Sequence, residues 1–350
     1  MKVLVSGANG FLGRHVVSTL LARGHEVRAL VRPASRTDHL QWADKVEFHR
    51  ADLRQKQQLP AAMDGIDAVL HLAAAVAGDE NQQFVHAVVG TENLVAAMAE
   101  GGVRRMLLCS SCSVYDWSKV NGVLSEDSPL EESGLYDRDG YAIAKRWQER
   151  VAQRFADMGE CRLTVVRPGL IWGRGRESVP GEGVSCGPFD LVFGPMGRLR
   201  LTHAENCASD VVNALEADTA EGHRYNIIDR DSIRTWRWVG ERNRRTQGRR
   251  IRVPIPYCVG IGVAILASMT SRLLFGPNGK LPGLFVPRRF QARFKPVRYN
   301  TAAIERASGA HPALSFEDCL ARTFGEGDSG ADSPSGSLSS AATRKPLSTS

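Results

Sequence analysis

The chain has 350 residues, 43% of them hydrophobic and 24% charged, and its formal net charge is +7. This length predicts one large α/β domain or two unequal lobes, and the apolar share excludes a largely disordered chain. Seven cysteines are too few for a disulfide scaffold and indicate a reducing, cytoplasmic compartment. Because only Met1 and Lys2 precede the first apolar run, we expect no signal peptide.

The positive charge is concentrated in one block. Residues 230–300 hold 16 Lys and Arg against two acids, a net charge of +14 that leaves −7 for the rest of the chain. Such a block can bind nucleic acid, anionic lipid or an acidic ligand, or it can be a solvated face. Since no zinc-ligand spacing, helix-turn-helix or RNP-like aromatic pattern accompanies it, we expect no nucleic-acid partner.

Short apolar runs alternate with amphipathic stretches over the first two thirds of the chain. We expect strands at Lys2–Ser6, Glu26–Val31, Lys45–Phe48, Ala68–Leu72, Met106–Ser110 and Arg162–Arg167, and helices at Gly13–Arg23, Leu53–Met63, Gln82–Glu100 and Tyr141–Asp157. This alternation predicts a doubly wound parallel sheet of Rossmann type, with helices on both faces and ligands at the carboxyl ends of the strands.

A glycine-rich loop follows the first predicted strand and opens a helix, and it comprises Gly7, Ala8, Asn9, Gly10, Phe11, Leu12 and Gly13. Glycines there let the backbone turn tightly beside a pyrophosphate, which the free N–H groups and partial positive charge of a helix N-terminus attract. The spacing GxxGxxG meets the GxGxxG fingerprint only in part, and a structural turn is the alternative. The loop predicts a dinucleotide coenzyme.

The pattern along the chain also predicts its division. Residues 173–200 are rich in Gly and Pro and are expected to be irregular, whereas a helix at Asn206–Ala217 and a strand at Arg224–Ile228 resume the alternation. We assign residues 1–172, with 201–228 returning to them, to a dinucleotide-binding domain, and residues 173–200 and 229–323 to a smaller substrate lobe. Residues 324–350 are mostly Gly, Ser, Ala, Thr and Pro and are predicted to be disordered.

The end of the second strand predicts which coenzyme is used. An acid there binds the ribose 2′-hydroxyl of NAD, whereas an arginine neutralises the 2′-phosphate of NADP. That strand ends in Arg32, with Arg36 nearby, so we favour NADP and keep NAD as the alternative. Asp52 and Leu53 after the third strand suit recognition of the adenine edge, although Asp52 could equally cap a helix.

Three residues form a candidate catalytic group. Tyr141 and Lys145 lie four residues apart and therefore share one face of the predicted helix. A nearby cation favours the phenolate over the phenol, whose usual pKa of about 10 is too high for a base at neutral pH. Ser111 follows a strand that should end at the same edge of the sheet, where a hydroxyl can donate to a developing alkoxide.

Together these features resemble the extended short-chain dehydrogenase/reductase superfamily, which includes the NAD-dependent epimerase/dehydratase family. The pattern is most similar to 3β-hydroxysteroid dehydrogenases and dihydroflavonol reductases. It covers residues 1 to about 323 and also includes His71-Leu72-Ala73-Ala74-Ala75, Gly90-Thr91-Glu92-Asn93-Leu94, Ser111 four residues before Tyr115, Arg167-Pro168-Gly169 and Leu201-Thr202-His203-Ala204-Glu205-Asn206.

The resemblance implies a role for each matching residue. Tyr141 would be the general acid/base, Lys145 a ribose ligand that modifies the tyrosine pKa, and Ser111 the group that orients the substrate oxygen. The coenzyme would contact the glycine loop, Arg32, Asp52, Leu53, Ala73, Lys145 and Pro168, and no metal is expected. Family members often dimerise, so a homodimer is a further expectation.

Two departures from the family pattern bear on function. Ala87 occupies a position where the family commonly has Asn, which questions a water-linked proton relay. Leu170 stands where sugar-nucleotide members have an Asn that meets the nucleotide, which argues against an epimerase. We therefore expect an NAD(P)-dependent dehydrogenase or reductase that interconverts a secondary alcohol and a ketone on a hydrophobic, steroid- or terpenoid-like molecule.

Two other functions stay open. One is a nucleotide-sugar epimerase or dehydratase with Arg174, Arg176, Arg198 and Arg200 as diphosphate ligands, and the other is a non-catalytic NAD(P)-binding scaffold or sensor. Residues 257–275 form an apolar segment that is either a buried helix, a substrate lid or an interfacial helix. Flanking arginines at 249, 250, 252, 288 and 289 favour peripheral contact with an anionic membrane.

Overall fold

The computed structural model describes residues 1–74, 80–217, 222–246, 248, 250–276, 281–308 and 313–325. Residues 326–350 of the predicted tail, and Ala75 of the family motif, lie outside this range. Phe324 ends helix α9 (Phe316–Phe324), so this helix includes the first residue that was assigned to the tail.

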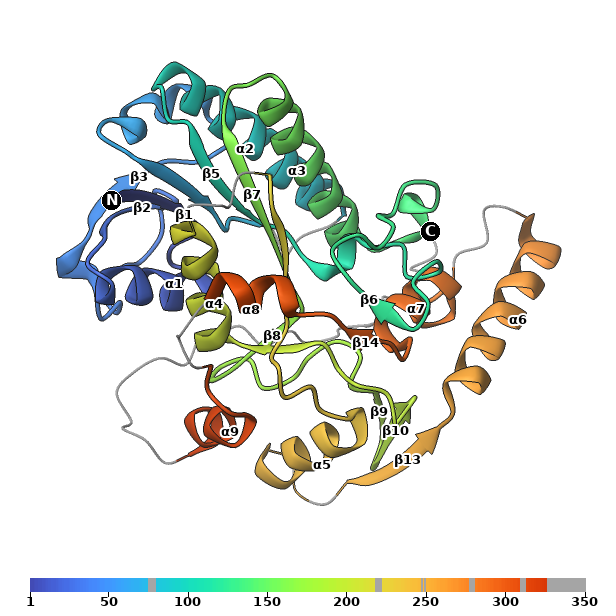
Figure 1. The fold of residues 1–350 in the computed structure, drawn as a ribbon. Coiled ribbons are helices and arrows are strands. Elements are labelled where there is room, and N and C mark those ends of the chain that lie inside the picture. Colours follow the sequence, from blue (N-terminus) through green and yellow to red (C-terminus); the bar gives the residue numbers. More distant parts are fainter. Residues whose placement is uncertain are drawn as a thin grey trace, which may run out of the picture.

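A seven-stranded sheet forms the centre of the larger lobe (Figure 1). Its order is β12-β7-β5-β4-β1-β2-β3 and every neighbouring pair is parallel. The strands are β1 (Lys2–Ser6), β2 (Glu26–Val31), β3 (Glu47–Arg50), β4 (Ala68–His71), β5 (Arg105–Cys109), β7 (Arg162–Pro168) and β12 (Arg224–Ile227). The predicted doubly wound parallel sheet is confirmed.

Helices cover both faces of this sheet, as the near-continuous apolar strands require. Val3 and Val5 of β1 pack on one side in a cluster with α1 (Phe11–Ala22), α4 (Ala204–Glu216) and α8 (Ala302–Ser308). Leu4 packs on the other side in a cluster with α2 (Glu80–Glu100) and α3 (Gly140–Asp157). Figure 1 shows α2 and α3 side by side over that second face.

The remaining elements form a smaller lobe beyond the carboxyl ends of the strands (Figure 1). Trp172, Trp238 and Phe316 lie in its core, and the Trp172 and Trp238 rings meet edge to face at 4.8 Å. The elements are β6 (Val123–Leu124), β8 (Leu170–Trp172), β9 (Val184–Cys186), β10 (Phe189–Phe193), β11 (Leu201–His203), α5 (Thr235–Thr246), β13 (Ile251–Ile255), α6 (Tyr257–Phe275), α7 (Pro287–Phe294), β14 (Arg298–Tyr299) and α9. This grouping differs from the expected division, because β6, β8 and β11 come from ranges assigned to the dinucleotide-binding domain, whereas α8, from the range 229–323, packs on the central sheet.

Three predicted elements are wrong or displaced. Leu53–Met63 is not a helix but two 3-10 turns, Lys56–Gln58 and Pro60–Met63, because Pro60 has no N–H to donate and starts a new turn. The third strand begins at Glu47, two residues later than predicted, after a 3-10 turn at Ala43–Lys45. Residues 173–200 are not wholly irregular, since β9 and β10 pair there as a hairpin that turns at Gly187, φ +54°.

Helix α6 is not the buried helix that the sequence left open. Small residues, Gly260 and Ala264, face the protein, and a Cβ at Gly260 would lie 2.5 Å from Phe290 of α7. Outside this contact the helix leaves large apolar side chains exposed: Val259, Val263, Ile265, Leu266, Met269, Leu273, Leu274 and Phe275. By length and composition, α6 is the one helix in the described residues that could cross a membrane.

Candidate active site

The glycine loop lies against the carboxyl end of β4, where a dinucleotide would cross the sheet. Gly7 has φ +74°, and a Cβ there would lie 2.9 Å from the Ala73 nitrogen. A Cβ at Gly13 would lie 2.1 Å from the Gly7 carbonyl oxygen, and one at Gly10 would lie 3.1 Å from it. The loop therefore folds on itself and packs on Ala73 only because side chains are absent.

The N-terminus of α1 fits a pyrophosphate. Gly10 is its N-cap, so no side chain caps the helix, and its first turn contains no acid. Asn9 and Phe11 are half-buried beside the exposed Gly10, whereas Leu12 is buried in the core behind the loop. A buried apolar anchor behind open backbone N–H groups is the arrangement that phosphate binding at a helix terminus needs.

Arginines gather at the ends of β2 and β3. Arg32 and Arg36 are exposed, and neither forms an ion pair with a carboxylate of the described residues. Arg50 at the end of β3 donates to the Ser35 carbonyl at 2.9 Å and to Thr37 Oγ1 at 3.0 Å. Sequence reasoning missed Arg50, which holds the loop carrying Arg36 and adds positive charge beside it.

The predicted adenine-edge residues are partly engaged with their neighbours. Both carboxylate oxygens of Asp52 accept from the Arg54 guanidinium, which, as the largest cause, lowers the pKa of Asp52 to about 2. Asp52 does not cap a helix, since none follows. Leu53 is half-buried, and its carbonyl accepts from Asn93 Nδ2 at 2.8 Å. Pro168 is buried at the end of β7.

Ser111 and Tyr141 come together at the carboxyl end of β5. Ser111 is the N-cap of a 3-10 turn at Cys112–Val114, and its Oγ accepts from the Ser113 N–H at 3.1 Å. Removal of water raises the pKa of the Tyr141 hydroxyl above its usual value, whereas a hydrogen bond from Ser111 and the charge of Arg176 lower it. Asp139 caps α3 by accepting from the Ala142 N–H at 3.0 Å, which fixes the first turn that carries Tyr141.

Lys145 lies one turn beyond Tyr141 on α3, as predicted, but its ammonium has another partner. Nζ donates to the Cys109 carbonyl at 2.7 Å, and the side chain is buried. Burial lowers the pKa of Lys145, while its positive charge helps to lower that of His71 to about 3, after the larger effect of burial. Lys145 was expected to lower the pKa of Tyr141, but it is not among the main groups that shift this pKa.

A buried polar network lies behind the glycine loop. It includes the backbone of Ala87, the residue that stands where the family commonly has Asn. His71 contacts Ser6 Oγ at 2.6 Å and Thr91 Oγ1 at 2.9 Å. Gln148 of α3 donates to Thr91 Oγ1 at 3.0 Å and lies 3.4 Å from the Ala87 carbonyl. His71 is therefore a hydrogen-bonded core histidine that joins β4 to α2.

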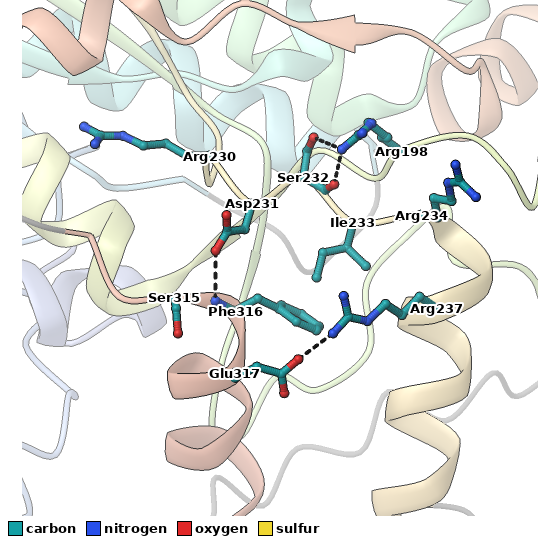
Figure 2. Close-up of a pocket in the computed structure, with 10 residues that line it drawn as sticks. All are labelled: Arg198, Arg230, Asp231, Ser232, Ile233, Arg234, Arg237, Ser315, Phe316 and Glu317. Atoms are coloured by element: carbon teal, nitrogen blue, oxygen red, sulfur yellow. Dashed lines mark hydrogen bonds and ion pairs between the residues drawn. The ribbon is translucent and has the colours of Figure 1, made fainter.

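An arginine-lined pocket of about 530 Å³ lies elsewhere in the smaller lobe (Figure 2). Arg198 donates there to the Ser232 hydroxyl, and Arg237 pairs with Glu317 at 2.5 Å. Its lining does not include the candidate catalytic residues, so it is a separate feature. It is formed by Arg198, Arg230, Asp231, Ser232, Ile233, Arg234, Arg237, Ser315, Phe316 and Glu317.

The fold and the glycine loop define a Rossmann-type dinucleotide-binding protein. The model of the NAD dependent epimerase/dehydratase family matches residues 3–185. The chain belongs to this family.

Relatives agree with that assignment. The human sterol-4-alpha-carboxylate 3-dehydrogenase, decarboxylating, is 29% identical over 340 residues, which are 92% of this chain and 87% of the human one. A 3 beta-hydroxysteroid dehydrogenase/Delta 5-->4-isomerase of Mycobacterium tuberculosis is 32% identical over 250 residues, 66% of each chain. The predicted class, an NAD(P)-dependent oxidoreductase of the extended short-chain dehydrogenase/reductase type, is confirmed.

Solved structures share the fold. The Thermus thermophilus UDP-glucose 4-epimerase in complex with NAD has a TM-score of 0.65 and 19% identity, covering 93% of this chain and 98% of that one. The crystal structure of gox2253 has a TM-score of 0.74 and 21% identity, covering 92% and 96%. Both likenesses support the Rossmann-like α/β fold of this chain.

Proposed function

We propose that this protein interconverts a secondary alcohol and a ketone on an apolar, sterol- or terpenoid-like molecule, with NADP(H) preferred over NAD(H). The observation that carries the proposal is that Ser111, which follows β5, and Tyr141, in the first turn of α3, bring their hydroxyl groups close enough for Ser111 to lower the pKa of the tyrosine. Two hydroxyl groups there can hold one substrate oxygen and move its proton.

Each side chain has a distinct task in this mechanism. When bound, the nicotinamide ring accepts or supplies the hydride. Because its pKa is raised, Tyr141 holds its proton at neutral pH and is suited to donate it to a developing alkoxide. Ser111 keeps the substrate oxygen within reach of the phenol, and Lys145, fixed by the Cys109 carbonyl, supplies positive charge at the same edge of the sheet.

The choice of NADP(H) rests on Arg32 and Arg36. Both guanidinium groups are exposed at the end of β2, and neither is neutralised by a carboxylate of the described chain. A 2′-phosphate would pair with one or both of them, as phosphate prefers the planar donor fork of arginine.

The substrate class is supported by the relatives and by the contacts that the arginines of the smaller lobe already make. The human and mycobacterial relatives are, by their names, sterol and steroid dehydrogenases. All four arginines proposed as diphosphate ligands have partners inside the protein. Arg174 binds the Gly325 carbonyl and Arg198 binds Ser232, while Arg176 lies over the Phe11 ring and Arg200 over the Trp117 ring. A nucleotide-sugar substrate is therefore disfavoured.

Helix α6 supports a location at a membrane surface. Its exposed apolar surface has no charged residue before Arg272. Figure 1 shows α6 at the margin of the smaller lobe, away from the central sheet. The described flanking arginines are engaged inside the protein: Arg250 with Asp190, Arg252 with the Trp236 carbonyl, Arg288 with Glu131 and Arg289 with the Arg138 carbonyl. Contact with lipid would thus be chiefly apolar.

The direct test follows NADPH absorbance with a panel of cyclic ketones, including steroids, in the wild-type protein and in Tyr141→Phe. We expect Tyr141→Phe to lose about a hundredfold or more in kcat while its NADPH dissociation constant stays within about twofold. Tyr225→Phe, which removes a phenol hydroxyl from β12, is the control. Full activity in Tyr141→Phe contradicts the mechanism.

A separate titration tests the coenzyme. NADPH and NADH are added while intrinsic tryptophan fluorescence is followed, first in the wild type and then in Arg32→Asp and Arg36→Asp. Loss of the NADPH preference in either variant is expected, and Arg306→Asp, at an exposed arginine of α8, serves as the control. A wild-type preference for NADH excludes the assignment.

A further inference from the structure

Arg138 contacts the turn that follows Ser111. Its side chain is 1% exposed, and its two terminal nitrogens donate to main-chain carbonyls, Nη1 to that of Tyr115 at 3.0 Å and Nη2 to that of Ser113 at 2.8 Å. Ser113 lies within the 3-10 turn that Ser111 caps, and Tyr115 is the residue that ends this turn. The buried guanidinium therefore holds the turn on which the position of the Ser111 hydroxyl depends.

The main chain of Arg138 leads directly into the helix that carries the other candidate hydroxyl group. The next residue, Asp139, is the N-cap of α3, and Tyr141 lies in the first turn of this helix. The Arg138 carbonyl is itself held, since Arg289 of α7 donates to it at 2.8 Å. The side chain and the main chain of one residue thus join the turn after Ser111 to the start of α3.

Arg138 is not available to bind a substrate itself. Both terminal nitrogens are occupied by carbonyls, and the buried carboxylate of Glu131 lies 3.5 Å from Nη1 and balances the charge. The Glu131 N–H also donates to the Val114 carbonyl at 2.8 Å. Three consecutive carbonyls, those of residues 113–115, therefore accept hydrogen bonds from the segment before α3, which restricts movement of the turn against the helix.

We propose that Arg138 is a positioning residue that sets the distance between the Ser111 and Tyr141 hydroxyl groups. The inference rests on the proposed function, in which these two groups hold one substrate oxygen and move its proton. The planar guanidinium offers its N–H groups in a fixed fork, so it controls both the distance and the angle between the segments that it joins. Misplacement of a reacting group by about 1 Å can cost about a hundredfold in rate.

The test is a double-mutant cycle between Arg138 and Ser111. With saturating NADPH and the steroid ketone that the wild type reduces fastest, kcat is measured for Arg138→Gln, Ser111→Ala and the double variant. We expect Arg138→Gln to lower kcat by about tenfold or more alone, but by less than about twofold in the Ser111→Ala background, where no serine hydroxyl is left to position. Arg138→Lys, whose ammonium can still donate to these carbonyls, should lose less than Arg138→Gln.

Arg28 of β2 provides the matched control. It is also a buried arginine, 6% exposed, that pairs with one carboxylate, Glu47, and donates to two main-chain carbonyls, those of Ala62 at 2.8 Å and Asp64 at 2.9 Å. Arg28→Gln should lower stability in urea as Arg138→Gln does, but it should leave kcat within about twofold of the wild type. A fall in kcat that Arg28→Gln shares, or that is equally large in the Ser111→Ala background, overturns the proposal.

Amide hydrogen exchange provides a readout that does not need turnover. In the coenzyme-free protein, Arg138→Gln should speed exchange by about tenfold or more in peptides covering residues 111–116 and 139–144, whereas Arg28→Gln should leave both at the wild-type rate. Unchanged exchange in Arg138→Gln overturns the proposal, even if kcat falls.

The two proposals can fail separately. If the wild type reduces no ketone, the proposed function fails, and exchange in the two segments alone decides whether Arg138 joins them. If Arg138→Gln does not fold, Arg138→Lys is used in both measurements, with smaller changes expected in the same direction, and wild-type kcat and exchange in Arg138→Lys would then overturn the inference.

Discussion

Arg167 and Glu149 form a bidentate ion pair inside the protein, with Nε and Nη2 each 2.9 Å from one carboxylate oxygen. Both side chains are almost fully buried, and Arg167 Nη1 also donates to the Tyr115 hydroxyl at 3.0 Å. Because Glu149 belongs to α3 and Arg167 to β7, the pair fixes the helix that carries Tyr141 against the central sheet.

Breaking this pair should be costly. Glu149→Gln leaves the buried guanidinium without its counter-charge, and we expect the free energy of unfolding to fall by about 3 kcal/mol in urea denaturation. Glu160→Gln breaks the exposed pair with Arg104 and should cost less than about 1 kcal/mol. Equal losses in the two variants would show that the buried pair is not a special support of α3.

Ser111 should set the pH dependence of catalysis. Its hydrogen bond lowers the pKa of Tyr141, so Ser111→Ala should raise that pKa. Alcohol oxidation needs the phenolate, and its kcat/KM profile should therefore move to higher pH, with a fall in kcat of about tenfold or more. Ser113→Ala is the matched control, since the Ser113 hydroxyl has no hydrogen-bond partner in the described residues. A profile that moves equally in both variants would refute this role.

His71 should make the protein sensitive to acid. Its pKa falls from about 6.5 in an unfolded chain to about 3 in the protein, chiefly through burial. The unfolded chain therefore binds the extra proton between these values, and stability present above pH 6.5 is lost as the pH falls, by up to about 1.4 kcal/mol per pH unit. Buried His203, with a pKa lowered to about 4, acts in the same direction.

The measurement is urea denaturation between pH 7 and pH 4. His71→Asn should flatten the fall in unfolding free energy, even if its stability at neutral pH is lower, whereas His39→Asn at an exposed position should keep the wild-type slope. An unchanged slope in His71→Asn would mean that other groups control acid unfolding.

Helix α6 should bind lipid through its exposed apolar surface. Leu273 and Phe275 are 85% and 70% exposed, and the double variant Leu273→Glu/Phe275→Glu should weaken co-flotation with phosphatidylcholine vesicles by more than about tenfold. Met158→Glu, at an isolated exposed methionine, is the control. Because the described flanking arginines are engaged inside the protein, adding phosphatidylserine should strengthen binding by only roughly 1 kcal/mol. This is about what a single arginine contributes near an anionic membrane surface. Binding that requires phosphatidylserine would refute an apolar contact.

The central sheet was predictable because its strands are buried on both faces and appear in the sequence as short apolar runs. Val3, Leu4 and Val5 are all fully buried. Pro60 within a polar stretch was a signal against the helix expected at 53–63. The β9–β10 hairpin was missed because its strands have three and five residues, although Gly187-Pro188 between them is a turn signal.

Only those features of the candidate site that depend on residues close together in the sequence were predictable. The glycine loop and the pairing of Tyr141 with Lys145 on one helix depend on neighbours in the chain. By contrast, Arg50 holds the loop after β2 by hydrogen bonds from a different strand, β3. Lys145 donates a hydrogen bond to the carbonyl of Cys109, 36 residues earlier in the chain. The flanking arginines could not be recognised as engaged, since their partners come from distant segments.

Gly260 connects the packing of α6 on α7 with the position of α3. Its missing side chain lets α6 rest directly on Phe290, and the same helix α7 carries Arg288 and Arg289. Those two arginines hold Glu131 and the carbonyl of Arg138, one residue before the aspartate that caps α3. A bulkier residue at position 260 would displace α7 and, through these two arginines, the first turn of α3. A substitution on the exposed apolar helix would therefore misalign Tyr141 with the substrate oxygen.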